Sequence, residues 1–276
     1  MTVTAYVPTL GAPRPTGRVT RLRYVVSDTL TLTKRNILNH IRIPESFFFA
    51  TVQPIMFVLL FRYVFGGAIK TPEANYVNYL MPGIFVQTVV FGSVSTGIGL
   101  AEDLQKGLIE RFRALPMSRS AVLAGRTTAD LCRNVFVVIV MTAVGFAVGF
   151  RPTTGVFLYV AGCLLILAFA YSLSWGMAVI GLSAPNSETA QVMSFPLLFP
   201  LTFASSAFVP VSSMPSWLQG FATYQPVSQV ANATRVLMID YPLALHTYQG
   251  LWATGMSLLI FAILAPLAVR KFRRAV

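Results

Sequence analysis

Long apolar runs alternate with short polar connectors along most of this chain of 276 residues. An apolar run of about 20 residues is the length that an α-helix needs to cross the hydrocarbon layer of a membrane. The pattern predicts six transmembrane spans, at about 46–65, 79–100, 134–150, 156–182, 189–208 and 248–269. The chain is therefore predicted to be an all-α polytopic membrane protein, with residues 45–276 forming one six-span transmembrane domain.

The segment before the first span has a different pattern. In residues 19–44, apolar side chains recur at helical spacing opposite a basic face. This arrangement is typical of an amphipathic helix that lies at the membrane interface. Residues 1–18 carry arginines and prolines without the apolar stretch of a secretory signal. They are expected to form a flexible cytoplasmic tail.

The second and third spans are joined by a charged connector, residues 101–133. It holds ten of the chain's thirty charged side chains, of both signs, together with an apolar stripe at helical spacing. Such a connector predicts a helix on the cytoplasmic side of the membrane, where a water-soluble protein can bind and move it. The alternative is a solvated loop whose charges only fix the topology. Asp130 and Arg133, three residues apart, are predicted to form a local ion pair.

Prolines mark the region around the fifth span. Pro196 and Pro200 lie inside it and are predicted to bend or break its helix. Residues 209–247, which follow, are too polar to span and contain several prolines and aromatic residues. They predict short re-entrant or extracellular helices, roughly 215–224 and 227–238, at the membrane boundary. These helices would close the external mouth of a path, with Trp217 as the external gate.

The basic residues predict the orientation of the chain. Cytoplasmic connectors of membrane proteins are rich in Lys and Arg. With both termini in the cytoplasm, 17 of the 21 Lys and Arg residues fall inside, and only Arg62, Lys70, Arg151 and Arg235 fall outside. The opposite orientation would place the larger group on the wrong side, so both termini are predicted to be cytoplasmic.

The composition excludes several classes of protein. Hydrophobic residues make up 55% of the chain, charged residues 11%, and the mean hydropathy is +0.67. The net charge of +12 is spread over termini and connectors, so no nucleic-acid partner is predicted. The sequence has no P-loop and no motif for a nucleophile or a metal site. We therefore expect no catalytic, metal-binding or cofactor-binding residue, and no enzyme activity in this chain.

Spans one, two and five are rich in phenylalanine and in neutral hydrogen-bonding side chains. Such a surface suits a large amphiphile better than a small ion. The candidate substrate path consists of Phe57, Phe61, Phe85, Gln87, Phe199 and Phe203. An ATP-independent carrier would be expected to have ionisable residues at mid-membrane depth, and spans two, four and six have none. A lipid-modifying enzyme would need clustered acidic or metal-ligand residues near the interface, which only the adjacent Glu102 and Asp103 approach.

Two parts of the chain resemble a known family. The first is the run GLIERFRALPMSR at 107–119, and the second is SSAFVP at 205–210 followed by MP-x-WL at 214–218 and PVS at 226–228. Together they resemble the type-2 ABC exporter permeases. Within these they are most similar to the daunorubicin/doxorubicin-resistance permeases of actinobacteria. The resemblance covers about residues 20–272 in the number and order of spans.

The resemblance implies a type-2 ABC exporter fold and a set of partners. In that family the first cytoplasmic connector forms a coupling helix that inserts into the nucleotide-binding subunit. By resemblance, Glu110, Arg111 and Arg113 would lie at this element, and Pro116 would mark the turn back to the membrane. Two P-loop ATPase subunits would bind ATP and Mg. A second copy of the permease, or a related permease, would complete the assembly among the membrane lipids.

The function implied by the resemblance is export across the bacterial plasma membrane. The expected substrate is lipophilic or amphiphilic, such as a drug, an antibiotic or a lipid-like compound, and the ATPase subunits would drive its movement. Export of a polysaccharide or a lipid-linked glycan is the alternative. An ATP-independent membrane carrier is the further alternative.

Overall fold

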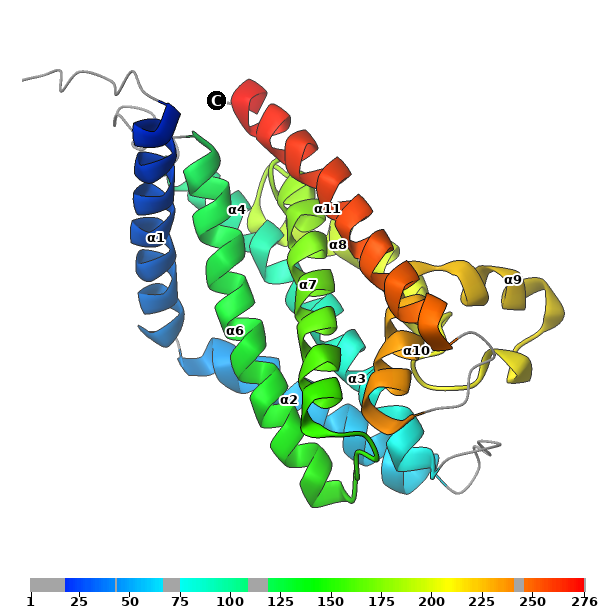
Figure 1. The fold of residues 1–276 in the computed structure, drawn as a ribbon. Helices are drawn as coiled ribbons and strands as arrows, with labels where there is room; N and C mark the ends of the chain where they lie inside the picture. The colour runs from blue at the N-terminus through cyan, green and yellow to red at the C-terminus, as the bar shows by residue number, and fades with distance from the viewer. Residues whose placement is uncertain (1–17, 43, 67–74, 109–118, 241–245, 276) are drawn as a thin grey trace, which may run out of the picture.

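The computed structural model describes residues 18–42, 44–66, 75–108, 119–240 and 246–275, and these residues form helices and turns without a strand. In chain order the helices are α1 (Arg18–Arg42), α2 (Pro44–Leu59), η1 (Leu60–Val64), α3 (Tyr76–Gly92), α4 (Val94–Gln105), α6 (Arg119–Val148), α7 (Val156–Gly181), α8 (Ser187–Phe203), η2 (Val211–Ser213), α9 (Ser216–Tyr224), α10 (Pro226–Ile239) and α11 (His246–Ala275). They pack as one bundle with α3 near its centre (Figure 1). The all-α prediction is confirmed.

Four of the described helices are long and apolar enough to cross a membrane. They are Tyr76–Gln105, Ser120–Val148, Val156–Gly181 and Trp252–Phe272, and Ala50–Val64 is a shorter apolar helix. The predicted fifth span corresponds to α8, which has 17 residues. Each predicted span therefore coincides with a helix, while the count of six crossings stays a prediction.

Both ends of the described chain lie at the same end of the bundle. Figure 1 places the start of α1, the start of α6 and the end of α11 together, at the top of the view. The turn between α6 and α7, residues 149–155, lies at the opposite end. This arrangement agrees with a topology in which both termini are on one side of the membrane.

The predicted amphipathic segment forms α1, which lies lengthwise beside α6 (Figure 1). The two helices approach closely at Gly125, where an added Cβ would lie 2.7 Å from the Leu32 Cβ. Thr33 Oγ1 donates to the Gly125 carbonyl at 3.3 Å. The exposed surface of α1 is mixed, with Leu30 and Ile41 beside Lys34 and Arg42. The helix is confirmed, and its place at the membrane interface stays a prediction.

The predicted break of the fifth span at its prolines is wrong. α8 continues through Pro196 and Pro200 and ends at Phe203. Each proline removes one backbone donor, and the neighbouring turns keep their own hydrogen bonds, so the helix tolerates the loss. The chain leaves the helix at Ala204, whose N–H still bonds to the Pro200 carbonyl at 2.9 Å.

The two short helices predicted after the fifth span are confirmed as α9 and α10. Pro226 fits the first turn of α10, where a missing N–H costs nothing, and the Gln225 side chain accepts from the Val227 N–H at 3.1 Å. α10 ends at Asp240, which has a left-handed φ of 49°. α9 lies at one side of the bundle (Figure 1).

Candidate functional site

The long helix Tyr76–Gln105 is interrupted at Ser93, between α3 and α4. There the Thr96 N–H bonds to the Ser93 carbonyl at 3.1 Å, so the regular ladder of backbone bonds is broken. Two side chains donate to the Gly92 carbonyl: Ser95 Oγ at 2.8 Å and Arg133 Nη2 at 2.5 Å. The interruption therefore ties the middle of this helix to α6.

Charged side chains join α1, α4 and α6 on the side of the break that leads to the charged connector. Asp103 Oδ2 lies 3.8 Å from Arg35 Nη2 and 4.0 Å from Arg126 Nη1. Arg126 Nε in turn lies 3.7 Å from Asp130 Oδ2. Because Arg126, Asp130 and Arg133 recur at helical spacing, one face of α6 carries the cluster toward Gly92.

Asp130 is the most enclosed member of this charge cluster, with an exposed fraction of 0%. It accepts hydrogen bonds from Ser95 Oγ at 3.0 Å and from Thr96 Oγ1 at 2.6 Å. A buried carboxylate is retained only where a cation and donors compensate its lost hydration. The sequence predicted a local pair with Arg133, whereas the structure gives Asp130 the Arg126 guanidinium and places Arg133 on the Gly92 carbonyl.

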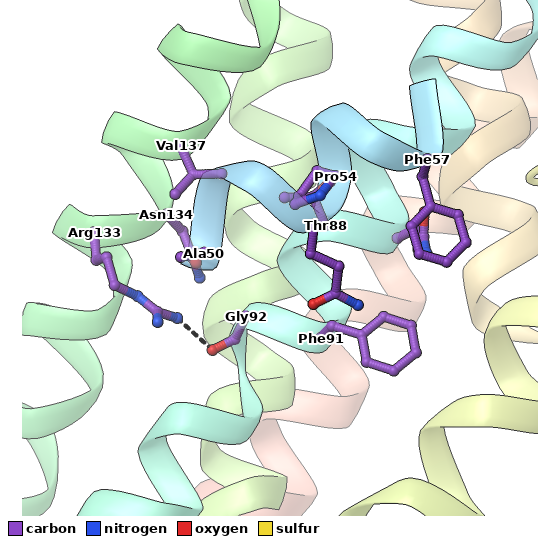
Figure 2. Close-up of a pocket in the computed structure, with 11 residues that line it drawn as sticks. Ala50, Pro54, Phe57, Thr88, Phe91, Gly92, Arg133, Asn134 and Val137 are labelled. Atoms are coloured by element: carbon purple, nitrogen blue, oxygen red, sulfur yellow. Dashed lines mark hydrogen bonds between the residues drawn. The ribbon is translucent and has the colours of Figure 1, made fainter. Parts of the chain in front are cut away.

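A pocket of about 110 Å³ lies beyond the charge cluster, between α2, α3 and α6 (Figure 2). It is lined by Ala50, Gln53, Pro54, Phe57, Gln87, Thr88, Phe91, Gly92, Arg133, Asn134 and Val137. In Figure 2 the Arg133 side chain reaches from α6 to the Gly92 carbonyl at the pocket wall. Glycine leaves room there for both side chains, because a Cβ on Gly92 would lie 2.7 Å from Asn134 Oδ1 and 3.3 Å from Arg133 Nη2 and would displace them.

Five phenylalanines continue from the rim of this pocket and form what we call the aromatic row. They are Phe57, Phe61, Phe199, Phe203 and Phe208. Ring centroids lie 6.2 Å apart for Phe57 and Phe61, 4.6 Å for Phe61 and Phe208, 5.4 Å for Phe203 and Phe208, and 4.3 Å for Phe199 and Phe203. The row joins the α2–η1 segment to α8, so it connects the pocket to a second helix of the bundle.

Comparison with known families identifies the chain. Residues 27–239 match the model of the family described as ABC-2 type transporter. The chain belongs to the ABC-2 type transporter family. The resemblance found in the sequence is thereby confirmed, and the chain is a membrane permease.

Three relatives show how far the similarity extends. The daunorubicin resistance ABC transporter permease protein DrrB1 of Streptomyces coeruleorubidus is 36% identical, over 90% of this chain and 87% of that protein. The probable doxorubicin resistance ABC transporter permease protein DrrC of Mycobacterium tuberculosis is 26% identical, over 100% of this chain and 99% of that protein. The putative transport permease ycf38 of Pyropia yezoensis is 25% identical, over 77% of this chain and 74% of that protein. These relatives are permease subunits, and ABC-2 permeases work with ATP-binding subunits.

The permease brings together several of the predicted path residues. Phe57 and Gln87 line the pocket, and Phe61, Phe199 and Phe203 belong to the aromatic row. Phe85 is separate from them, because its fully buried ring lies edge-on to Phe150 in the core.

The predicted coupling and gate residues fall in different parts of the permease. Glu110, Arg111, Arg113 and Pro116 lie outside the described residues. Trp217 is on α9 with 79% of its surface exposed. Sequence reasoning did not assign a site to Asp130, Arg133 and Asn134. The charges of Asp130 and Arg133 could have indicated one, because charged residues inside an apolar helix are a general signal of function.

Arg235 is the other feature that the sequence did not reveal. It was counted among the outside cations, but its exposed fraction is 0%. Its guanidinium donates to the carbonyls of Tyr79 at 2.9 Å, Ser206 at 2.6 Å and Ala207 at 2.9 Å. It also donates to Asn232 Oδ1 at 2.8 Å and lies 3.7 Å from the centre of the Tyr79 ring. Arg235 thus joins α10 to α3 and to the turn after α8.

Proposed function

We propose that this permease exports a lipophilic or amphiphilic compound from the cytoplasm or the inner leaflet of the bacterial plasma membrane. The main support for this proposal is the aromatic row, which lies beside a pocket with both polar and apolar side chains in its wall. Two of its relatives are named for resistance to daunorubicin and doxorubicin. A separate P-loop subunit, binding ATP and Mg, would drive the movement.

Loss of one ring from the row is expected to impair transport. Phe203 pairs with Phe57, Phe199 and Phe208, and an aromatic pair is worth about 0.5–1.5 kcal/mol beyond the area it buries. Phe203→Leu should therefore lower ATP-dependent uptake of daunorubicin by roughly 2–10-fold. The measurement is drug fluorescence in inverted membrane vesicles that contain the permease and its ATPase subunit.

The matched control for this variant is Phe146→Leu, because Phe146 also makes aromatic contacts but lies away from the row, against Phe150 and Tyr159. It should leave uptake close to wild type at equal expression. Equal uptake by the two variants would argue against a substrate path along the row.

We also propose that the connector after α4 couples the permease to two ATPase subunits, through Glu110, Arg111, Arg113 and Pro116. The geometry around it supports this proposal. α4 leads into the connector and α6 follows it, and the charge cluster joins both helices to α1. A movement of the connector would therefore be passed to helices that hold the pocket.

Pairing with a second copy, or with a related permease, would give a path between two permeases. The outward surface of α8 supports a contact with another apolar surface, since Val192, Phe195 and Leu197 are exposed. Membrane lipids would cover the remaining apolar faces. On the outer side, α9 with its exposed Trp217 would form the external gate.

The proposed orientation, with both termini in the cytoplasm, can be tested by cysteine labelling. Ser216, at the start of α9, and Ser183, between α7 and α8, are both exposed. In a background without Cys132 and Cys163, a cysteine at 216 should react with an impermeant thiol reagent added outside intact cells. A cysteine at 183 should react only after the membrane is opened. Reversed labelling would overturn the orientation.

A further inference from the structure

Three buried polar atoms that line the pocket have no hydrogen-bond partner within the protein. They are Gln87 Oε1, Arg133 Nε and Asn134 Nδ2, and their residues have exposed fractions of 2%, 7% and 2%. A buried polar group without a partner costs about 1–3 kcal/mol. Three of them around one pocket therefore indicate a place built to receive a polar group.

The charges around the pocket specify the sign of that group. Arg133 is the charged residue among those that line the pocket, and the carboxylates of Asp103 and Asp130 in the neighbouring cluster lie against the Arg126 guanidinium. The pocket wall therefore presents a positive charge. A buried cation is most stable beside an anion, and an arginine fork binds carboxylate and phosphate oxygens preferentially.

The size of the pocket limits what can enter it. Its 110 Å³ is room for several water molecules. A carboxylate or a phosphate therefore fits this space. Phe57 and Phe91 also line the pocket, and Phe57 begins the aromatic row, so the apolar part of such a molecule can continue along the row.

We propose that this pocket binds the acidic head group, a carboxylate or a phosphate, of an amphiphile whose apolar part lies along the aromatic row. Arg133 Nε and Asn134 Nδ2 donate to the acidic oxygens. Where the head group is a singly ionised phosphate, Gln87 Oε1 accepts from its remaining hydroxyl. The inference rests on the proposed export function and assigns acidic amphiphiles to it as one class of substrate. The same chemistry occurs in membrane lipids, which are the second source of such a head group.

The test uses the permease purified with its ATPase subunit in phosphatidylcholine nanodiscs. Two probes share one tail: a pyrene-labelled long-chain fatty acid and its methyl ester. The acid should bind at least about tenfold more tightly than the ester, because a hydrogen bond to a charged group contributes more than a neutral one. Arg133→Gln should remove this preference, so that the acid and the ester bind within about twofold of each other. Arg151→Gln, at an exposed cation away from the pocket, should preserve it.

A second variant protects the test against misfolding, since Arg133 also bonds to the Gly92 carbonyl. Asn134→Ala removes an unpaired donor, and should lower the preference for the acid over the ester about threefold or more. Equal binding of the acid and ester to the wild type would overturn the proposal. So would an acid preference that survives both variants.

Two further measurements identify the source of the head group and separate this proposal from the export function. ATP-driven movement of the acid in proteoliposomes would assign the site to the transported compound. Acid binding without movement, with competition by phosphatidic acid, would assign it to a membrane lipid and support the pocket proposal alone. Movement of daunorubicin without any acid preference would leave the export function standing and refute the pocket proposal.

Discussion

Replacing Arg235 by methionine is expected to lower the stability of the permease by about 3–5 kcal/mol. The guanidinium is fully buried and donates to three backbone carbonyls, which belong to Tyr79, Ser206 and Ala207. Methionine fills much of the same volume but leaves these acceptors short of donors in an apolar environment. The midpoint of thermal unfolding in detergent should fall by on the order of 10 °C.

Two companion variants show which property of Arg235 matters. Arg235→Lys keeps the charge but lacks the planar fork, so most of the stability loss should remain. Tyr79→Phe removes only the hydroxyl that donates to the Ser206 carbonyl at 3.0 Å, and should cost about 1 kcal/mol. If Arg235→Met unfolds at the wild-type temperature, the turn after α8 is held by its other contacts and Arg235 is dispensable.

The helices were predictable from hydropathy to different degrees. The predicted span 156–182 matches α7, Val156–Gly181, closely, because short polar turns mark both of its ends. The third span was predicted at about 134–150 as the continuation of a helix that begins in the charged connector, and α6 does begin there, at Arg119. The charged residues leave the exact start of this helix outside the hydropathy pattern. These charged residues are compatible with a helix in the bundle because α4 supplies their partners, Asp103 for Arg126 and the hydroxyls of Ser95 and Thr96 for Asp130.

The candidate site was only partly predictable, because its contacts join residues that are far apart in the chain. Gln87 and Phe57 were selected by residue type, and both line the pocket. The bond from Arg133 to Gly92 spans 41 residues, and that from Thr96 to Asp130 spans 34. A helical pattern reports only neighbours three or four positions away. For this reason the sequence suggested Arg133 as a partner of Asp130 and gave no sign of the helix break at Ser93.

The same contacts give α4 a mechanical role in the proposed mechanism. One end of α4 leads into the charged connector, where Asp103 holds it to α1 and α6. Its other end meets the break at Ser93, beside the pocket. A rigid helix of this length transmits a displacement along its axis, while the break allows α3 to respond separately. The hydrogen bonds from Ser95 and Thr96 to Asp130 fix this helix to α6.

Asp130→Asn is accordingly expected to separate ATP hydrolysis from transport. The substitution keeps the shape of the side chain but removes the charge that pairs with Arg126 and accepts from Ser95 and Thr96. Hydrogen bonds to a charged group contribute about 1.5–3 kcal/mol each. Weakening them should let α4 move without carrying α6, so transport should fall by about tenfold or more. ATP hydrolysis by the complex should remain within about twofold of wild type, since the connector itself is unchanged.

The measurement pairs phosphate release with daunorubicin uptake in the same inverted vesicles, at matched permease levels. Asp240→Asn is the control, because Asp240 is an exposed carboxylate after α10, an element that carries no member of the cluster, and its left-handed φ of 49° suits asparagine. It should leave the ratio of transport to hydrolysis unchanged. A parallel fall of both activities in Asp130→Asn would make the aspartate a structural residue only. Because the charge cluster is buried against α4, a fall in transport alone would instead place the coupling step at the contact between α4 and α6.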